Sequence, residues 1–206
     1  MQPPALRSAT ETERHQVLQT VVLGFAADPL NRWFLGGAAN YLDTAYSLID
    51  ALGGSAIDAG SAYVVSADTN NTDAGQDLAG AALWLPPNIK PDAEPVLKLL
   101  QAAMVPERLN EVFELVEKIG EHQPKEAHWY LPYIAVDPVH QGQGLGSKLM
   151  KHALRMCDET QTLAYLESSN PKNMSLYERH GFETLARIQV ESSPPVHPMV
   201  RQPRRL

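Results

Sequence analysis

The sequence predicts a single α/β domain over residues 1–206, in which helices flank a sheet. Apolar residues make up 44% of the 206 residues and charged residues 20%, which suits a folded chain with a substantial core. Strand-like runs and amphipathic helical runs follow one another along the chain. A glycine-rich segment at residues 141–147 joins a strand-like run to a helical run, which is typical of a strand–turn–helix unit.

The first fifty residues predict a short strand and two helices. Residues 5–7 are expected to form the strand, and a capping box at Thr10–Glu13 should start the first helix. Asp28-Pro29 should stop that helix, because a proline disfavours helical geometry in the residue before it. The second helix is expected over residues 41–52, with Gly53-Gly54 at its end.

The middle of the chain predicts two strands and a helical insertion. Strands are expected at residues 61–67 and 78–85, with the polar residues 69–76 forming a turn between them. Residues 91–124 form a separate block, which is interpreted either as a lid or as an insertion packed on the sheet. A short helix is expected over residues 96–103. A longer amphipathic helix follows, with an apolar face made of Leu109, Val112, Phe113, Val116 and Ile119.

A third clear strand is expected over residues 128–136. Because Pro132 cannot donate a hydrogen bond to a neighbouring strand, a bulge or splayed pairing should occur there. The glycine-rich segment follows, and a helix should run from about residue 144 to residue 158. Residues 163–167 predict the next strand.

The last forty residues predict a short helix and a hairpin. Asn170 should cap the helix, Pro171 should occupy its first position and Gly181 should end it. Residues 182–190 and 196–201 then predict the two strands of a closing hairpin.

The glycine-rich segment is a candidate phosphate site. Glycine tolerates positive φ and the close approach of a ligand, and a helix N-terminus offers unpaired amides and the positive end of its dipole. A P-loop is excluded because no glycine here has the required Gly-Lys-Ser/Thr continuation. The dinucleotide pattern Gly-x-Gly-x-x-Gly does not fit, because the glycines stand at positions 142, 144 and 146. An ordinary strand-to-helix turn without a ligand is the alternative.

The segment Gln141-Gly142-Gln143-Gly144-Leu145-Gly146 resembles the Gln/Arg-x-x-Gly-x-Gly loop of the GCN5-related N-acetyltransferase (GNAT) family, which holds the pyrophosphate of acetyl-coenzyme A. The preceding residues 133–138 resemble the fourth strand of that family. Asn170 is followed seven residues later by Tyr177 and then by Gly181-Phe182, which is similar to the closing motif of the family.

The resemblance covers residues 129–182. Within it, residues 129–132 and 165–167 are similar to the branch that includes puromycin N-acetyltransferase. The resemblance implies the GNAT fold, an α/β fold with a mixed, mostly antiparallel sheet that is splayed between its fourth and fifth strands and flanked by helices. It also implies a coenzyme-binding core at about residues 128–182, with a helical insertion at about residues 91–124.

The resemblance further implies acetyl-CoA as the acyl donor. The pantetheine arm would lie between the two splayed strands like an extra strand, and the pyrophosphate would lie on the amides of the glycine-rich loop. Asn170 would hydrogen-bond the arm, with Asn173 as a second candidate, although Asn170 fits a simple helix cap equally well. The residues expected to bind the coenzyme are Ile134, Ala135, Val136, Gln141, Gly142, Gln143, Gly144, Leu145, Gly146, Ser147, Asn170 and Asn173.

The resemblance implies Tyr177 as the general acid that protonates the leaving thiolate, since a phenol keeps its proton at neutral pH. By itself Tyr177 also fits a core aromatic residue on an amphipathic helix. The general base is left open among Glu167, His128 and Tyr130, and a base that acts through water is a further option. His128 also fits a structural histidine on a strand.

The expected function is transfer of an acetyl group from acetyl-CoA to a primary amine of a small molecule by direct attack. The alternatives are a protein or peptide N-acetyltransferase and a non-catalytic acyl-CoA-binding sensor. A net charge of -7 argues against a nucleic-acid partner.

No apolar run is long enough to span a membrane, so no membrane partner is expected. The first residues lack the pattern of a signal peptide, and the single cysteine, Cys157, cannot form an intrachain disulfide. A cytoplasmic location is therefore expected. No metal is expected, and the protein is expected to be a monomer or a homodimer.

Overall fold

The structure is a computed structural model that describes residues 6–36, 41–67, 77–91, 93–103 and 108–205. The elements in chain order are β1 (Leu6–Ser8), η1 (Glu11–Glu13), α1 (Arg14–Gly24), α2 (Pro29–Leu35), α3 (Tyr41–Gly53), α4 (Ser55–Asp58), β2 (Ala62–Ser66), β3 (Leu78–Leu85), α5 (Ala93–Ala103), α6 (Leu109–Glu121), β4 (His128–Val136), η3 (Pro138–His140), α7 (Leu145–Glu159), β5 (Leu163–Ser168), η4 (Pro171–Asn173), α8 (Met174–Arg179), β6 (Glu183–Thr184) and β7 (His197–Arg201).

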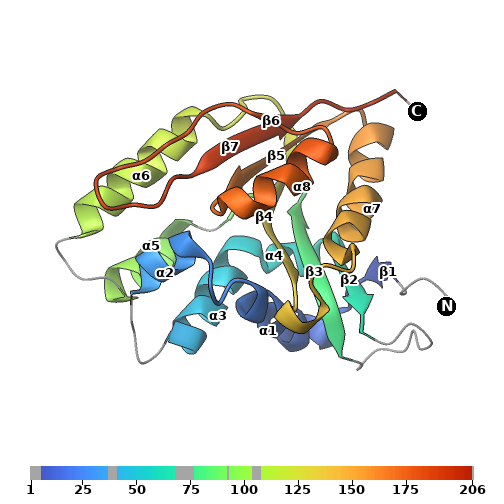
Figure 1. Cartoon of the computed structure of the whole chain (residues 1–206), viewed down its shortest axis with the longest axis horizontal. Helices are drawn as coiled ribbons and strands as arrows, with labels where there is room; N and C mark the ends of the chain where they lie inside the picture. Colours follow the sequence, from blue (N-terminus) through green and yellow to red (C-terminus); the bar gives the residue numbers. More distant parts are fainter. Residues whose placement is uncertain (1–5, 37–40, 68–76, 92, 104–107, 206) are drawn as a thin grey trace.

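One mixed sheet organises the molecule (Figure 1). In the described part of the chain its strands follow the order β1-β2-β3-β4-β5-β7-β6. The pair β4–β5 is parallel, and every other described pair is antiparallel. The α/β fold with a mostly antiparallel sheet is therefore confirmed.

The sheet splits between β4 and β5. The two strands pair only from His128–Tyr130 to Leu163–Tyr165. Beyond these residues β4 stays paired with β3 as far as Val136, and β5 stays paired with β7 as far as Ser168. The facing edges of β4 and β5 therefore diverge into an open wedge, which confirms the predicted splay.

A bulge lies in β4 at the predicted place. Leu83 of β3 faces Tyr133 and Leu85 faces Tyr130, so that β3 advances two residues while β4 advances three. The extra residue falls at Leu131-Pro132, as expected for a proline in a strand. It also shifts the alternation of side chains, so that Tyr130 and Tyr133 both pack against the same hydrophobic cluster.

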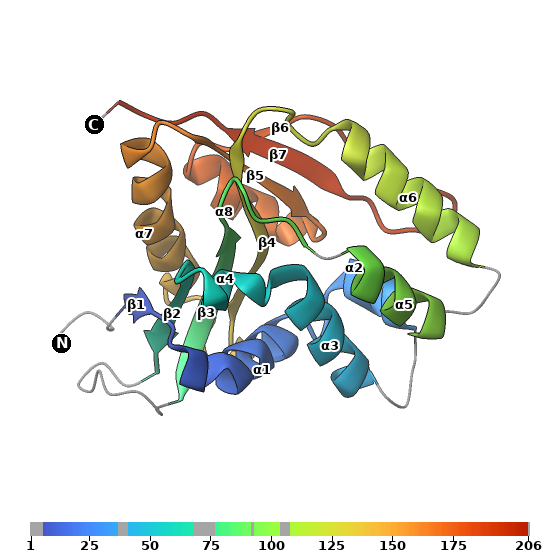
Figure 2. The same cartoon turned by 180° about the vertical axis from the view of Figure 1, so that it is seen from behind.

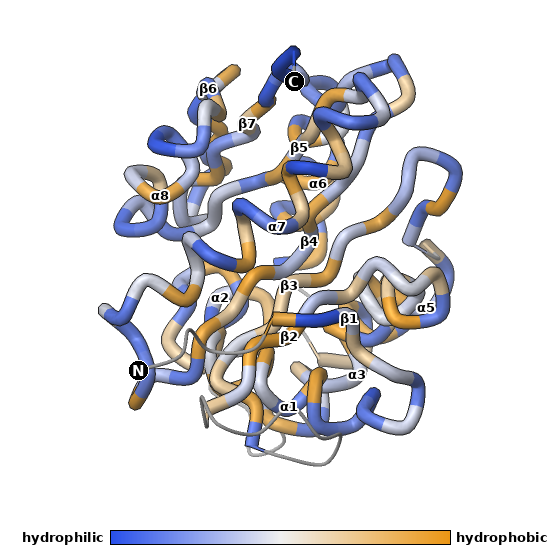
Figure 3. Tube along the Cα trace, turned by 90° about the vertical axis from the view of Figure 1, so that its right-hand side faces the viewer, coloured by the Kyte–Doolittle hydropathy of each residue, from blue (hydrophilic) through white to orange (hydrophobic). Residues whose placement is uncertain are grey.

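Two helical layers cover the sheet. The first contains α1 and α3, whose buried side chains form one cluster with the side chains of Tyr133 and Ala135. The second contains α7 and α8, which pack around Trp84 and Trp129 on the opposite face. Figure 2 shows the first layer from its outer side, and hydrophobic residues run along the central strands in Figure 3. No helix in the described residues is long and apolar enough to cross a membrane.

The helices differ from the prediction at α2. Asp28-Pro29 was expected only to stop the preceding helix. In the structure the Asp28 carboxylate accepts hydrogen bonds from the amides of Leu30 and Asn31, each at 3.0 Å, and starts α2. The same dipeptide thus ends one helix and caps the next, because proline is well suited to the first helical position.

Two further predictions need correction. In α6 the predicted residues Leu109, Val112 and Ile119 pack in the core cluster, but Phe113 and Val116 are about half exposed, and the buried Leu115 was not predicted to be on this face. Residues 182–190 form only the short strand β6 and a bridge from Ile188 to Val196, because the chain leaves the sheet between them. The predicted turn at 69–76 lies outside the described residues.

Candidate functional site

A cavity of about 250 Å³ lies where the sheet splits. One wall is formed by β4 from Tyr130 to Ile134, and another by Leu166 and Glu167 of β5. Helices α2, α3, α5 and α6 close it with apolar side chains. These four helices all precede residues 129–182, the segment that carries the family resemblance, so the cavity depends on how they pack around the sheet.

The cavity is mostly apolar but has a small polar set. Its polar lining residues are Asn31, Tyr130, Tyr133, Glu167, Ser169, Asn173 and Tyr177. Of the lining residues that the structure describes, Glu167 is the single carboxylic acid, and none is a lysine, arginine or histidine. Trp33, Tyr41 and Trp84 belong to the core and do not line it.

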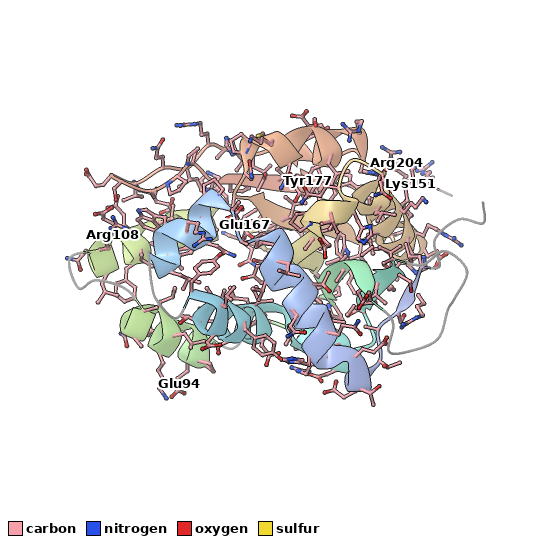
Figure 4. All side chains as sticks on the ribbon, turned by 60° about the horizontal axis from the view of Figure 1, so that its bottom comes forward. Glu94, Arg108, Lys151, Glu167, Tyr177 and Arg204 are labelled. Carbon is pink, nitrogen blue, oxygen red and sulfur yellow. The ribbon has the colours of Figure 1, made fainter. Side chains whose placement is uncertain are left out.

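Glu167 occupies the edge of the wedge on β5. Burial raises the pKa of its carboxyl to about 7, although interactions with the phenols of Tyr130 and Tyr165 act in the opposite direction. The side chain lies in the interior of the molecule in Figure 4, whereas Glu94 and Arg108 lie at its edge. A carboxyl with a pKa close to neutrality can take up and release a proton under physiological conditions.

Tyr177 reaches the cavity from the other layer. It belongs to α8, is 7% exposed and packs with its ring edge towards Phe182. Burial and the nearby charge of Asp28 raise the pKa of its phenol well above 10, so the hydroxyl stays protonated at neutral pH. An intact sheet would separate Tyr177 from the helices of the first layer, and the split between β4 and β5 brings them together.

The proximity of Asp28 to the cavity was not predicted. Its carboxylate accepts a hydrogen bond of 2.7 Å from Ser169 Oγ, just after β5, in addition to its bonds to α2. Burial raises the pKa of Asp28 despite these hydrogen bonds. Asp28 therefore fastens α2 to the end of the strand that carries Glu167. The sequence did contain a signal for the start of α2, because Asp followed by Pro is typical of the first residues of a helix.

Tyr130 and Tyr133 both line the cavity. Burial raises the pKa of both phenols, and the charge of Glu167 raises it further. Only Tyr130 was singled out from the sequence. An odd separation places two residues on opposite faces of a regular strand, and the bulge at Pro132 reverses that placement.

The glycine-rich loop presents unpaired amides. Gly142 and Gly144 both have φ of +77°, and a Cβ atom at either position would meet nothing within 4 Å. Lys148 is the first amide of α7 to donate within the helix, to the Gly144 carbonyl. In the described chain, the amides of residues 143–147 have no hydrogen-bond partner. They are thus available to an anion.

The side chains at both ends of the loop are already engaged. Gln141 Nε2 donates to the Val136 carbonyl at 3.1 Å, which fixes the end of β4 against the loop. The Ser147 hydroxyl contacts His180 Nε2 at 2.8 Å. Main-chain groups, rather than these two side chains, are therefore the free groups of the loop.

The remaining candidate residues divide between the cavity and other roles. Asn170 accepts a hydrogen bond from the Lys172 amide at 3.1 Å and caps η4, whereas Asn173 lines the cavity. His128 is not among the lining residues, and its Nδ1 contacts the Glu126 carbonyl at 2.8 Å. The structure thus brings Tyr130, Glu167 and Tyr177 together and leaves His128 outside.

Two other kinds of site find no support within the described residues. These residues contain no group of three or more His, Cys, Asp or Glu side chains that could hold a metal ion. Cys157 is fully buried in the second layer, where burial raises the pKa of its thiol to about 12. A thiol with that pKa is inert at neutral pH.

The sequence is similar to known acetyltransferases. The sequence profile described as the acetyltransferase (GNAT) family matches residues 58–182. An uncharacterized N-acetyltransferase of Schizosaccharomyces pombe is 33% identical over 78 residues, which are 36% of this chain. The match covers 32% of that relative, so the two proteins share about a third of the relative's length.

Solved structures share the fold at low sequence identity. A Corynebacterium glutamicum protein described as histone acetyltransferase HPA2 and related acetyltransferase has a TM-score of 0.67 and 22% identity, covering 98% of both chains. Arylalkylamine N-acetyltransferase 2 of Aedes aegypti has a TM-score of 0.65 and 14% identity, covering 96% of this chain and 98% of its own. The C-terminal condensation domain of Ebony, in complex with beta-alanyl-dopamine, has a TM-score of 0.72 and 16% identity, covering 98% and 100%.

Proposed function

Because the chain belongs to the acetyltransferase (GNAT) family and is therefore an acyltransferase, we propose that it moves an acetyl group from acetyl-CoA to a primary amine of a small molecule. One observation carries this proposal: a single cavity holds a carboxyl with a pKa of about 7 and a protonated phenol on the two sides of a split sheet. The two groups match the two proton transfers that aminolysis of a thioester needs.

The coenzyme site in this proposal is built from main-chain groups. The free amides of residues 143–147 bind the pyrophosphate at the start of α7. The unpaired edge of β4 at Ile134, Ala135 and Val136 pairs with the amides of the pantetheine arm, which lies in the wedge. Asn173 lines the cavity at the end of this path and is favoured over Asn170, which already caps η4.

Glu167 acts as the general base. The amine enters as an ammonium ion and transfers a proton to the Glu167 carboxylate, directly or through water. Glu167 then returns this proton to the solvent. The neutral nitrogen attacks the thioester carbon, the carbon–sulfur bond breaks as Tyr177 protonates the sulfur, and the second proton of the nitrogen passes through water to the Tyr177 phenolate. Since the pKa of Glu167 is about 7, its carboxylate is available from neutral pH upwards.

Tyr177 acts as the general acid. Its hydroxyl donates a hydrogen bond to the sulfur as negative charge develops there, and supplies the proton that the thiolate needs. The raised pKa of the phenol keeps this proton in place over the whole working range of pH. Tyr130, beside Glu167, holds the carboxylate in position rather than acting as the base itself.

Free-thiol release with acetyl-CoA and a panel of amines tests the proposal. We expect thiol release that depends on both substrates, and acetylated amine in equal amount. Coenzyme binding by calorimetry without any turnover would support a sensor instead. The histone acetyltransferase description of one structural neighbour makes a lysine peptide a necessary member of the panel, since turnover of the peptide alone would indicate a protein acetyltransferase.

A further inference from the structure

The charges that line the cavity limit what can enter it. Among the described residues, Glu167 is the one acidic residue that lines the cavity, and no lysine, arginine or histidine lines it. A substrate with one ammonium group can be matched by this carboxylate. The nearby Asp28 carboxylate already accepts hydrogen bonds from Leu30, Asn31 and Ser169 and does not line the cavity. A second ammonium group would therefore find no free carboxylate among the described lining residues, which is strongly unfavourable in an apolar environment.

The walls of the cavity are apolar on the side away from the wedge. The residues that form this side are Phe34, Leu48, Leu52, Val96, Leu100 and Ile119. A cavity of about 250 Å³ exceeds the roughly 150 Å³ that holds a benzene molecule, and in the proposed function the thioester end of the coenzyme shares it. The space that remains for the acceptor is therefore small and fits a compact group. This region fits a compact apolar group and offers no polar partner for a sugar or a peptide backbone.

Asn31 is a polar lining residue at the start of α2, next to Asp28, whose carboxylate is bonded to Ser169 just after β5. Its side chain is 6% exposed and lines the cavity, and its Nδ2 atom has no hydrogen-bond partner among the described residues. An unpaired buried amide is costly to the fold unless a ligand satisfies it. Asn31 is held in place because its own backbone amide bonds to Asp28.

Starting from the proposed acetyl transfer, we infer that the acceptor is a compact apolar monoamine with one hydroxyl or carbonyl group, and that Asn31 selects it by hydrogen-bonding that group. The ammonium end lies at Glu167, the apolar body lies among the α3 and α5 side chains, and the oxygen lies at Asn31. Asn31 is therefore a specificity-determining residue rather than a catalytic one.

The test compares acceptors by kcat/KM in the thiol-release assay with the full chain. The amines are 2-phenylethylamine, 2-cyclohexylethylamine, the ring- and side-chain-hydroxylated phenylethylamines, spermidine and a lysine peptide. We expect 2-phenylethylamine to exceed spermidine and the peptide by at least about 100-fold, because of their extra buried polar groups. At least one hydroxylated isomer should exceed 2-phenylethylamine by about five- to tenfold.

The variant Asn31→Leu tests the role of the amide. In this variant the ratio of kcat/KM for the best hydroxylated isomer to kcat/KM for 2-phenylethylamine should fall to about one. Asn110→Leu, at an exposed position of α6, is the matched control and should keep the preference. If Asn31→Leu does not fold, Asn31→Ala, which also removes the side-chain amide, replaces it and should show the same loss.

Other outcomes contradict the inference. Spermidine or the peptide as the best acceptor, no preference for any hydroxylated isomer, or an unchanged preference in a folded Asn31 variant would each overturn it. If no amine released thiol, the proposed function would fail, and calorimetry with the same amines would decide the inference separately. Tighter binding of a hydroxylated isomer than of 2-phenylethylamine would still support it, and equal binding would overturn it.

Discussion

At the scale of single residues, Tyr177 is the most sharply defined group of the site. Tyr177→Phe removes the hydroxyl and keeps the buried ring that packs against Phe182. We expect kcat to fall by about 10²- to 10⁴-fold, with little change in coenzyme affinity, because general-acid catalysis is lost. Steady-state kinetics and calorimetry measure the two quantities.

The control for this change is Tyr63→Phe. Tyr63 lies in the second layer, where its hydroxyl contacts the sulfur of Met156 at 3.6 Å, and it does not line the cavity. This variant should keep kcat within a few-fold of the unchanged protein. Equal turnover in Tyr177→Phe and the unchanged protein would remove Tyr177 from the mechanism.

Glu167 should control the pH dependence of both activity and stability. The rate should rise with pH up to about 7, where the carboxyl loses its proton, and Glu167→Gln should abolish most of the activity. Burial of Glu167 is tolerated best when the carboxyl is protonated. Its contribution to stability is therefore fully present below about pH 4.5 and is lost as pH rises through about 7.

The difference between these two pKa values corresponds to about 3 kcal/mol at most. Glutamine does not ionise, so Glu167→Gln should not lose stability as pH rises. The stability of the variant relative to the unchanged protein should therefore increase from pH 5 to pH 8. Denaturant unfolding at both pH values measures the effect, and the exposed Glu183→Gln is the control. A variant whose relative stability falls over this range would contradict the assignment.

At the scale of elements, a change in the glycine-rich loop should weaken coenzyme binding more than it destabilises the fold. Gly144→Val places a side chain in open space at a φ of +77°, which costs about 1–2 kcal/mol of stability and blocks the loop amides. Calorimetry should show coenzyme binding weakened by at least about tenfold. Gly60→Val is the matched control, since Gly60 has a φ of +68° and also has nothing within 4 Å.

Gly60 lies between α4 and β2, away from the loop, so its variant should lose similar stability and bind the coenzyme normally. Equal coenzyme affinity in both variants would show that the loop does not hold the pyrophosphate. The comparison therefore tests the site and not merely the backbone strain.

The junction of β1 with α1 depends on a partly buried ion pair. Arg7 donates to both carboxylate oxygens of Glu13, at 2.8 and 2.5 Å, and the Thr10 amide donates at 2.9 Å. These contacts, above all the Arg7 hydrogen bonds, lower the pKa of Glu13 to about 2. The stabilisation is therefore present above about pH 4.5 and is lost as pH falls through about 2.

Glu13→Gln should accordingly cost about 2 kcal/mol at pH 7 and much less at pH 3. Unfolding in urea at the two pH values measures the difference. The exposed Glu11→Gln in the same 3₁₀ turn is a suitable comparison, with an expected cost below about 0.5 kcal/mol. A cost for Glu13→Gln that did not depend on pH would contradict the ion-pair account.

The elements that the sequence predicted well are those whose signals are local. The strands at 78–85 and 128–136, the capping box and the helix after the glycine-rich loop depend on periodicity or turn chemistry within a few residues. The family resemblance added the splay between β4 and β5. Helix α2 was missed because its start was interpreted only as the end of α1.

At the scale of the whole molecule, the acceptor cavity could not be predicted residue by residue. Asn31 and Leu100 belong to segments that meet only after α2, α3, α5 and α6 pack around the wedge. Tyr133 faces the cavity because of a bulge, and a bulge changes the face of every residue beyond it. The sequence predicted the strands that carry Tyr130 and Glu167, while the other residues that line the cavity could be identified only in the folded chain.

The proposed mechanism requires that the split between β4 and β5 lets an acyl thioester lie between Glu167 and Tyr177. A crystal structure with coenzyme A and the preferred amine is the decisive measurement. We expect the sulfur within hydrogen-bonding distance of the Tyr177 hydroxyl and the pyrophosphate on the amides of residues 143–147. A sulfur atom outside the wedge, or a pyrophosphate bound away from that loop, would contradict it.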